Sequence, residues 1–147
     1  LTQPGEPYQV GGSVRLREGG DASILAIGGM ISLALQAADQ LSRQGVEVRV
    51  VGLLSVKPID EDAIQAAARE TGAIVTAEDH NRYGGLGGAV AEAVVRRAPV
   101  PMEQVALNDT FAESGSVKAL YAKYAMTAED IAAAVLRVLA RKAPGRS

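Results

Sequence analysis

The sequence predicts an α/β fold of three layers, in which helices cover both faces of a mostly parallel sheet. Short apolar runs alternate along the chain with segments whose apolar residues recur at helical spacing. The runs at residues 23–27 and 73–75 are continuously apolar, as in parallel strands that are buried on both faces. The chain has 147 residues, which suits one domain that buries roughly 70% of its unfolded surface. Strands that alternate with helices fold in this way because each crossover places a helix against the sheet.

The first strand differs from the others. In residues 9–18, Val14 and Leu16 alternate with Arg15 and Arg17, the period of a half-exposed strand at a sheet edge. The following strands are expected at residues 23–27, 46–54, 73–76 and 100–107.

The helices follow these strands, and several carry recognisable end signals. Asp60 is the expected N-cap of the second helix and Gly72 its stop, Gly45 suits a left-handed C-cap position, and Thr127 caps the last helix, which runs to Arg141. The expected helices cover residues 30–44, 60–72, 86–97, 116–124 and 127–141.

Composition excludes several classes of function. The net charge is −2 without a basic patch, which argues against nucleic-acid binding. No apolar run approaches the ~20 residues that cross a bilayer, and no signal peptide opens the chain, so we expect a cytoplasmic protein without a membrane partner. Cysteine is absent and there is one histidine, a poor basis for a transition-metal site.

The predicted domain covers residues 9–142. Residues 1–8 are expected to form a linker because they are polar and contain Pro and Gly, and residues 143–147 a disordered tail. Since Leu1 stands where an initiator methionine would be, we expect the chain to be part of a longer one.

Candidate sites lie where strands end, because ligands of open α/β sheets bind at the carboxyl ends of the strands. Three turns qualify: Gly28-Gly29, residues 78–88 and residues 108–115. Each precedes a helix whose free amides suit an anion. The glycines also suit close packing of a strand against a helix, and the two interpretations both stand.

The segment from Glu78 to Gly88 is the most distinctive of the three. Glu78 and the sole histidine, His80, are two residues apart, so on an extended chain they project to one side and Asp79 to the other. The carboxylate either orients the imidazole for proton transfer or makes a structural hydrogen bond. The glycines do not form a dinucleotide fingerprint, because Val90 stands at its sixth place. No serine lies in a nucleophile-elbow pattern.

Phe111 is the only phenylalanine of a chain with 3% aromatic residues. It is expected to be an anchor, either in the core or across a domain interface. The candidate interface or ligand-binding residues are Glu78, His80, Asn81, Gly84, Gly85, Gly87, Gly88, Asp109, Phe111 and Ser114.

Four segments together carry a family resemblance. They read L-S-V-K-P-I-D (54–60), T-G-A-I-V-T-A-E-D-H-N-R-Y-G-G-L-G-G-A-V-A-E (71–92), D-T-F-A-E-S-G (109–115) and Y-A-M-T-A-E-D-I (124–131). Their order and spacing resemble the C-terminal domain of transketolase, a thiamine diphosphate-dependent family, over nearly the whole chain after Gln9. The E-D-H-N wording is closer to transketolase than to deoxyxylulose-phosphate synthase or the pyruvate dehydrogenase beta subunit.

The resemblance implies a five-stranded mixed sheet whose first strand is antiparallel. It also implies that two other domains hold the diphosphate and the aminopyrimidine and carry the activating glutamate and the metal ligands. No catalytic, cofactor-binding or metal residue is therefore expected in this chain. Thiamine diphosphate and a divalent metal are implied for the complete enzyme.

The implied function is that of a third domain or subunit. The complete enzyme would move two-carbon ketol units between sugar phosphates, as in the pentose phosphate pathway. This chain alone would be inactive and would pack against the pyrimidine-binding and diphosphate-binding domains, contribute to a homodimer and offer a place for a regulatory ligand. The alternatives are an independent anion- or metabolite-binding module, the C-terminal domain of a deoxyxylulose-phosphate synthase or 2-oxo acid dehydrogenase beta subunit, a self-standing subunit of a split enzyme, and a stand-alone enzyme that uses Glu78 and His80.

Overall fold

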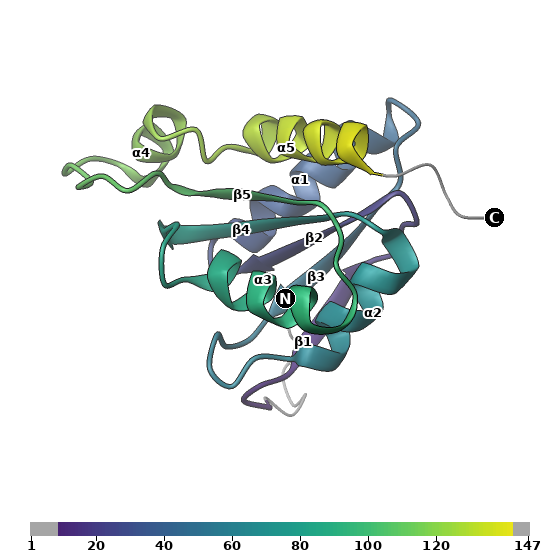
Figure 1. The fold of residues 1–147 in the computed structure, drawn as a ribbon. Coiled ribbons are helices and arrows are strands. Elements are labelled where there is room, and N and C mark those ends of the chain that lie inside the picture. The colour runs from purple at the N-terminus through teal and green to yellow at the C-terminus, as the bar shows by residue number, and fades with distance from the viewer. Residues whose placement is uncertain (1–8, 143–147) are drawn as a thin grey trace.

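The computed structural model describes residues 9–142, so the linker predicted at 1–8 and the tail predicted at 143–147 lie outside the described part. The described chain forms five strands and five helices (Figure 1). The strands are β1 (Ser13–Arg17), β2 (Ala22–Ile27), β3 (Val48–Leu53), β4 (Ile74–Asn81) and β5 (Met102–Leu107). The helices are α1 (Met30–Ser42), α2 (Glu61–Thr71), α3 (Leu86–Arg97), α4 (Val117–Lys123) and α5 (Ala128–Arg141).

The five strands form one mixed sheet in the order β1-β3-β2-β4-β5. The strands β3, β2, β4 and β5 are parallel to their neighbours, and β1 runs antiparallel to β3 at one edge. The expected five-stranded sheet with an antiparallel first strand is confirmed. Because β2 is central, it is buried on both faces from Ala22 to Ala26.

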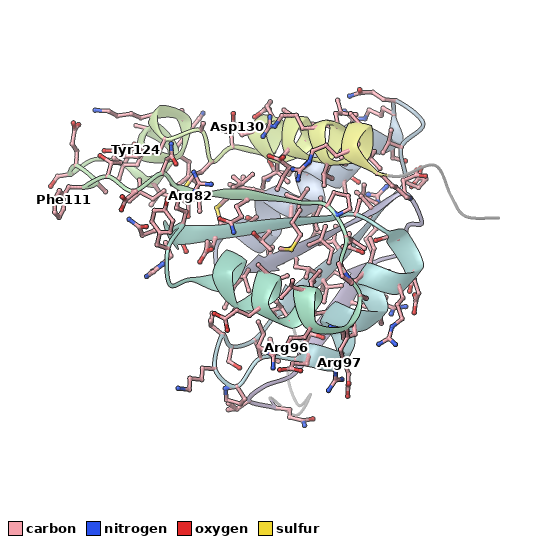
Figure 2. All side chains as sticks on the ribbon, viewed as in Figure 1. Arg82, Arg96, Arg97, Phe111, Tyr124 and Asp130 are labelled. Carbon is pink, nitrogen blue, oxygen red and sulfur yellow. The ribbon has the colours of Figure 1, made fainter. Side chains whose placement is uncertain are left out.

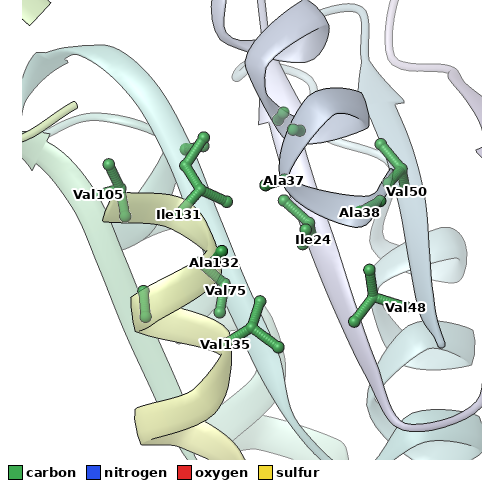
Figure 3. Close-up of a cluster of buried hydrophobic side chains, with 14 of the residues drawn as sticks. Ile24, Ala37, Ala38, Val48, Val50, Val75, Val105, Ile131, Ala132 and Val135 are labelled. Atoms are coloured by element: carbon green, nitrogen blue, oxygen red, sulfur yellow. The ribbon is translucent and has the colours of Figure 1, made fainter. Parts of the chain in front are cut away.

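Helices cover the sheet on both sides and enclose two apolar cores. On one face α1 and α5 pack on Ile24, Val50 and Val75 (Figure 3). On the other face α2 and α3 pack on the alternate residues of the same strands, such as Leu25 and Ile74. Alanine, valine, leucine and isoleucine supply nearly all of both cores. No helix of the described residues is long and apolar enough to span a membrane.

The predicted helix ends are confirmed where a capping side chain or a left-handed glycine marks them. Asp60 accepts a hydrogen bond from the Ala63 amide at 3.0 Å, and Gly72 adopts the left-handed conformation (φ 67°) after α2. Thr127 and Asp130 form a reciprocal capping box at the start of α5. Gly45 is also left-handed (φ 80°), although α1 has already ended at Ser42.

The prediction for β4 was wrong at its carboxyl end. The strand was expected to end at Thr76, because the charged residues that follow are typical of a loop, but it continues to Asn81. The pairing with β5 shifts between Ala77 and Asn81, so the charged stretch forms a bulged extension of the strand. Three further strands are shorter than predicted, since β1 covers 13–17, β3 covers 48–53 and β5 starts at Met102.

Candidate functional site

Glu78 lies at the carboxyl end of β4 and caps α3. Its side chain is buried, with 2% of the residue exposed. One carboxylate oxygen accepts a hydrogen bond from the Leu86 amide at 2.6 Å and the other from the Gly87 amide at 2.8 Å. A helix N-terminus favours a negative group because its first amides lack partners and its dipole is positive there. The anion position at this turn is therefore filled by the chain's own carboxylate.

The glycines of this turn give the carboxylate its space. A Cβ built on Gly85 would overlap Glu78 Oε2 and lie 2.8 Å from His80 Nδ1. A Cβ on Gly87 would lie 2.7 Å from the Gln104 side chain of β5. Gly84 has a φ of 76°, which favours glycine, whereas a Cβ on Gly88 would meet nothing within 4 Å. Close packing accounts for Gly85 and Gly87.

His80 lies beside this cap at the surface. Its imidazole is 61% exposed, and Nδ1 lies 2.8 Å from the Asn81 carbonyl oxygen and 3.9 Å from Glu78 Oε2. Glu78 and His80 thus project to one side of the strand, as their spacing indicates. Each oxygen of Glu78 accepts one helix amide, so the cap on α3 accounts for the position of this buried carboxylate without a role for the imidazole.

Asp79 projects to the opposite face, toward the start of α1. A Cβ built on Gly29 would lie 3.8 Å from Asp79 Oδ2 and 3.2 Å from the Tyr121 hydroxyl. The Tyr121 hydroxyl donates a hydrogen bond to Asp79 Oδ2 at 3.1 Å. Burial first, and then the hydrogen bond and charge of Asp79, raise the pKa of Tyr121 above its usual value. A carboxylate at the Gly28-Gly29 turn repels any further anion there.

Metal binding has no support in the described part of the chain. Residues 9–142 contain no group of three or more His, Asp or Glu side chains that could hold a metal ion.

The third turn leads into an arm, which we define as residues 108–124. The arm extends beyond the end of the sheet and carries α4 (Figure 1). Phe111 is 99% exposed at its tip, and Val117 at the start of α4 is 64% exposed. α4 has no buried residue. Figure 2 shows Phe111 pointing away from the sheet, with Tyr124 and Arg82 nearer the base of the arm. Of the two alternatives for Phe111, a place in the core is excluded within the described chain.

The arm is braced although it is exposed. The Ser116 hydroxyl accepts a hydrogen bond from the Ala119 amide, and the Tyr124 hydroxyl accepts one from the Glu113 amide. Lys123 Nζ lies 2.6 Å from Glu113 Oε2, and this hydrogen bond raises the pKa of Lys123. The apolar tip is therefore presented on a chain segment with a defined conformation.

Unusual backbone conformations occur near the start of the arm and directly after its end. Asp109 has a φ of 48° and Ala125 a φ of 55°. Positive φ is uncommon for residues other than glycine and costs of order 1 kcal/mol each. The Asn81 side chain donates to Asp109 Oδ1 at 3.4 Å and so joins the end of β4 to this end of the arm.

The candidate residues therefore form two groups. Glu78, His80, Gly85 and Gly87 meet at the start of α3, whereas Phe111 and Ser114 are exposed on the arm. Sequence reasoning missed Tyr121, Tyr124 and Arg82, which bind the arm to the sheet or lie at its base. The scarcity of aromatic residues is the signal that could have singled out the two tyrosines.

Comparison with known proteins decides the family. The family described as "Transketolase, C-terminal domain" matches residues 11–131. The chain belongs to this family. The match spans β1 to the first turn of α5, so it covers both the Glu78 turn and the arm.

Individual relatives include both transketolase subunits and synthases. The chain is 42% identical to the 6-deoxy-6-sulfo-D-fructose transketolase subunit SqwH of Clostridium sp. (strain MSTE9), over 93% of this chain and 42% of that one. It is 36% identical to an apulose-4-phosphate transketolase subunit of Phocaeicola vulgatus, over 84% and 39%. It is 40% identical to the 1-deoxy-D-xylulose-5-phosphate synthase of Syntrophotalea carbinolica, over 88% of this chain and 21% of the synthase.

A solved structure is similar to the chain in both fold and sequence. The chain superposes on a "Split gene transketolase, inactive beta4 tetramer" with a TM-score of 0.93 and 44% identity, over 97% of this chain and 46% of that one. In each of these four comparisons the chain spans less than half of the matched protein.

Proposed function

We propose that this chain is the third domain, or a subunit carrying it, of a transketolase-type enzyme that transfers two-carbon ketol units between sugar phosphates. A transketolase subunit and a split-gene transketolase, 42% and 44% identical to the chain, support this proposal, together with the E-D-H-N wording of residues 78–81. Thiamine diphosphate and a divalent metal belong to other domains of the complete enzyme. We place that enzyme in the cytoplasm and in pentose phosphate metabolism.

The role of this chain is to pack against the pyrimidine-binding and diphosphate-binding domains and to support a homodimer. One observation carries this proposal: the only phenylalanine of the chain is 99% exposed on a braced arm. A few anchor side chains near the centre of an interface, often aromatic, supply most of the binding energy. The arm is therefore the expected interface, with Asp109, Phe111 and Ser114 on its surface, and the Glu78–Gly88 turn supports the end of the sheet from which it extends.

The carboxylates beside two of the turns argue against an independent anion-binding module. Glu78 occupies the amides at the start of α3, and Asp79 lies at the start of α1. We therefore place no regulatory anion at either turn.

The test combines this chain with a protein that carries the other two domains. Phe111→Ser should weaken association at least about tenfold, because an apolar anchor is lost. Val95→Ser is the matched control, since Val95 is 67% exposed on α3 and lies outside the arm. Affinity would be measured by calorimetry and ketol transfer by a coupled assay. Equal affinity of the two variants would contradict the role of the arm.

A separate measurement tests the proposal that this chain alone is not catalytic. Thiamine diphosphate with Mg²⁺, titrated into this chain alone, should give no binding heat. Micromolar binding would overturn that assignment whatever the outcome for Phe111.

A further inference from the structure

The outer edge of β5 is open to a further strand. Backbone groups of a strand face its two neighbours alternately. The Pro101 carbonyl oxygen accepts from the Ile74 amide and the Leu107 carbonyl oxygen from the Arg82 amide, so both face β4. The Met102 carbonyl oxygen faces outward, where Arg141 donates to it at 2.9 Å. The same alternation turns the amides and carbonyls of Gln104 and Ala106 outward.

A groove runs along this edge. Two cavities, of about 340 and 490 Å³, share Arg82, Glu103 and Gln104 in their walls. The first continues past Ala106 and Asn108 to Tyr124. The second reaches Met102 and Arg141. The outward peptide groups of Gln104 and Ala106 therefore border open space. Figure 1 shows no other element of the described chain beyond β5 in the sheet.

The groove contains more arginine side chains than carboxylates, and within the described part of the chain Arg82 is the one left without an ion pair. Glu103 is shared by Arg137 at 3.5 Å and Arg141 at 2.6 Å. The Asp130 carboxylate accepts from the amide and hydroxyl of Thr127 in the capping box. Arg82 has no carboxylate within ion-pair distance among residues 9–142. It donates to Asn108 Oδ1 at 2.6 Å and lies 5.8 Å from the Tyr83 ring.

We propose that the β5 edge binds an extended polypeptide segment that carries a carboxylate side chain. The segment pairs with the backbone of Gln104 and Ala106, and its carboxylate meets Arg82. Arg141 closes the edge at Met102, which limits the pairing to the part of the strand nearer the arm. Main-chain pairing supplies affinity in strand addition, and side chains beside the edge supply selectivity. This proposal does not depend on Phe111 or on the class of reaction of the complete enzyme.

The test uses the acetylated and amidated peptide Thr-Glu-Val-Glu-Val-Thr and a counterpart in which lysine replaces both glutamates. Amide hydrogen exchange of the free chain should be fast at Gln104 and Ala106 and slow at Glu103 and Val105. The acidic peptide should slow exchange at Gln104 and Ala106, and the basic peptide should bind at least about tenfold more weakly, because it meets Arg82 with like charge.

Two variants separate pairing from charge. Ala106→Pro removes an outward amide and leaves the ladder to β4 intact, since proline is tolerated at sheet edges; it should reduce affinity about tenfold, as for one lost hydrogen bond. Arg82→Gln should abolish the preference for the acidic peptide, whereas Arg96→Gln, a control on α3, should change neither property. Binding that Ala106→Pro leaves unchanged, or protection absent at saturating peptide, would overturn the proposal.

Discussion

The Glu78 turn and the arm both follow strands of one sheet, yet they treat their exceptional residues in opposite ways. At the Glu78 turn a charged side chain is buried, and two helix amides satisfy both of its oxygens. On the arm an apolar side chain is exposed, and the polar residues around it hold its backbone in place. The contrast shows that a strand end rich in charged residues and glycine can pair its buried carboxylate within the chain itself. The exposed apolar surface lies instead on the arm, around Phe111 and Val117.

The largest expected effect tests whether the Glu78 turn is closed. Gly85→Ala should lower the free energy of unfolding by about 3 kcal/mol, because the new methyl group overlaps Glu78 Oε2 and displaces a buried carboxylate from its two donors. Gly88→Ala is the matched control, since it meets nothing within 4 Å and should stabilise α3 by up to about 1 kcal/mol. Urea denaturation measures both. Similar values for the two variants would show that the turn has room to spare.

A smaller loss of stability is expected when the Glu78 carboxylate itself is replaced. Glu78→Gln keeps one acceptor oxygen but brings an amide NH₂ toward a helix N–H, so about 1–3 kcal/mol should be lost. Glu92→Gln on the exposed side of α3 is the control and should change stability by less than about 0.5 kcal/mol. A loss at Glu78 no greater than at Glu92 would mean that the cap contributes little.

The smallest effect concerns the attachment of the arm. Tyr121→Phe removes the hydrogen bond to Asp79 and should cost about 1 kcal/mol. The folded-state pKa of Tyr121 is raised above 10.0, so its contribution is present in full below pH 10 and is lost as the pH rises through the higher folded-state value. The wild-type chain should therefore lose stability over that alkaline interval more steeply than Tyr121→Phe. The free energy of unfolding of both proteins would be measured by urea denaturation from pH 8 to 11. The same dependence on pH in the wild type and in Tyr121→Phe would contradict this attachment.

Much of the fold could be predicted because its signals are local. The α3 boundaries, the Asp60 and Thr127 caps and the edge position of the first strand follow from spacing and side-chain chemistry, and the structure confirms them. The end of β4 could not be predicted in the same way. A charged stretch is typical of a loop, and only the amides of α3, which approach Glu78 in three dimensions, make its burial favourable.

The candidate site was predictable only in part. The spacing of Glu78 and His80 indicated that they share a side, but not that α3 takes up both carboxylate oxygens. The composition singled out Phe111 without deciding between core and surface, because that depends on how far the arm extends from the sheet. Arg82 lies within the candidate turn 78–88 but was not singled out, since its importance comes from the edge of β5, which is distant in sequence.

The adjacency of Glu78 and Asp79 has a consequence for how this chain tolerates insertions and deletions. Successive residues of an extended strand point to opposite faces, and here Glu78 accepts the first amides of α3 on one face, whereas Asp79 lies beside the Gly28-Gly29 turn and accepts from Tyr121 on the other. A single residue inserted after Ala77 would exchange their directions and leave the α3 amides facing the aspartate, whereas two inserted residues would restore the directions but displace both side chains by about 7 Å along the strand. The carboxyl end of β4 is thus sensitive to whether its length is odd or even, a constraint that no single substitution would reveal.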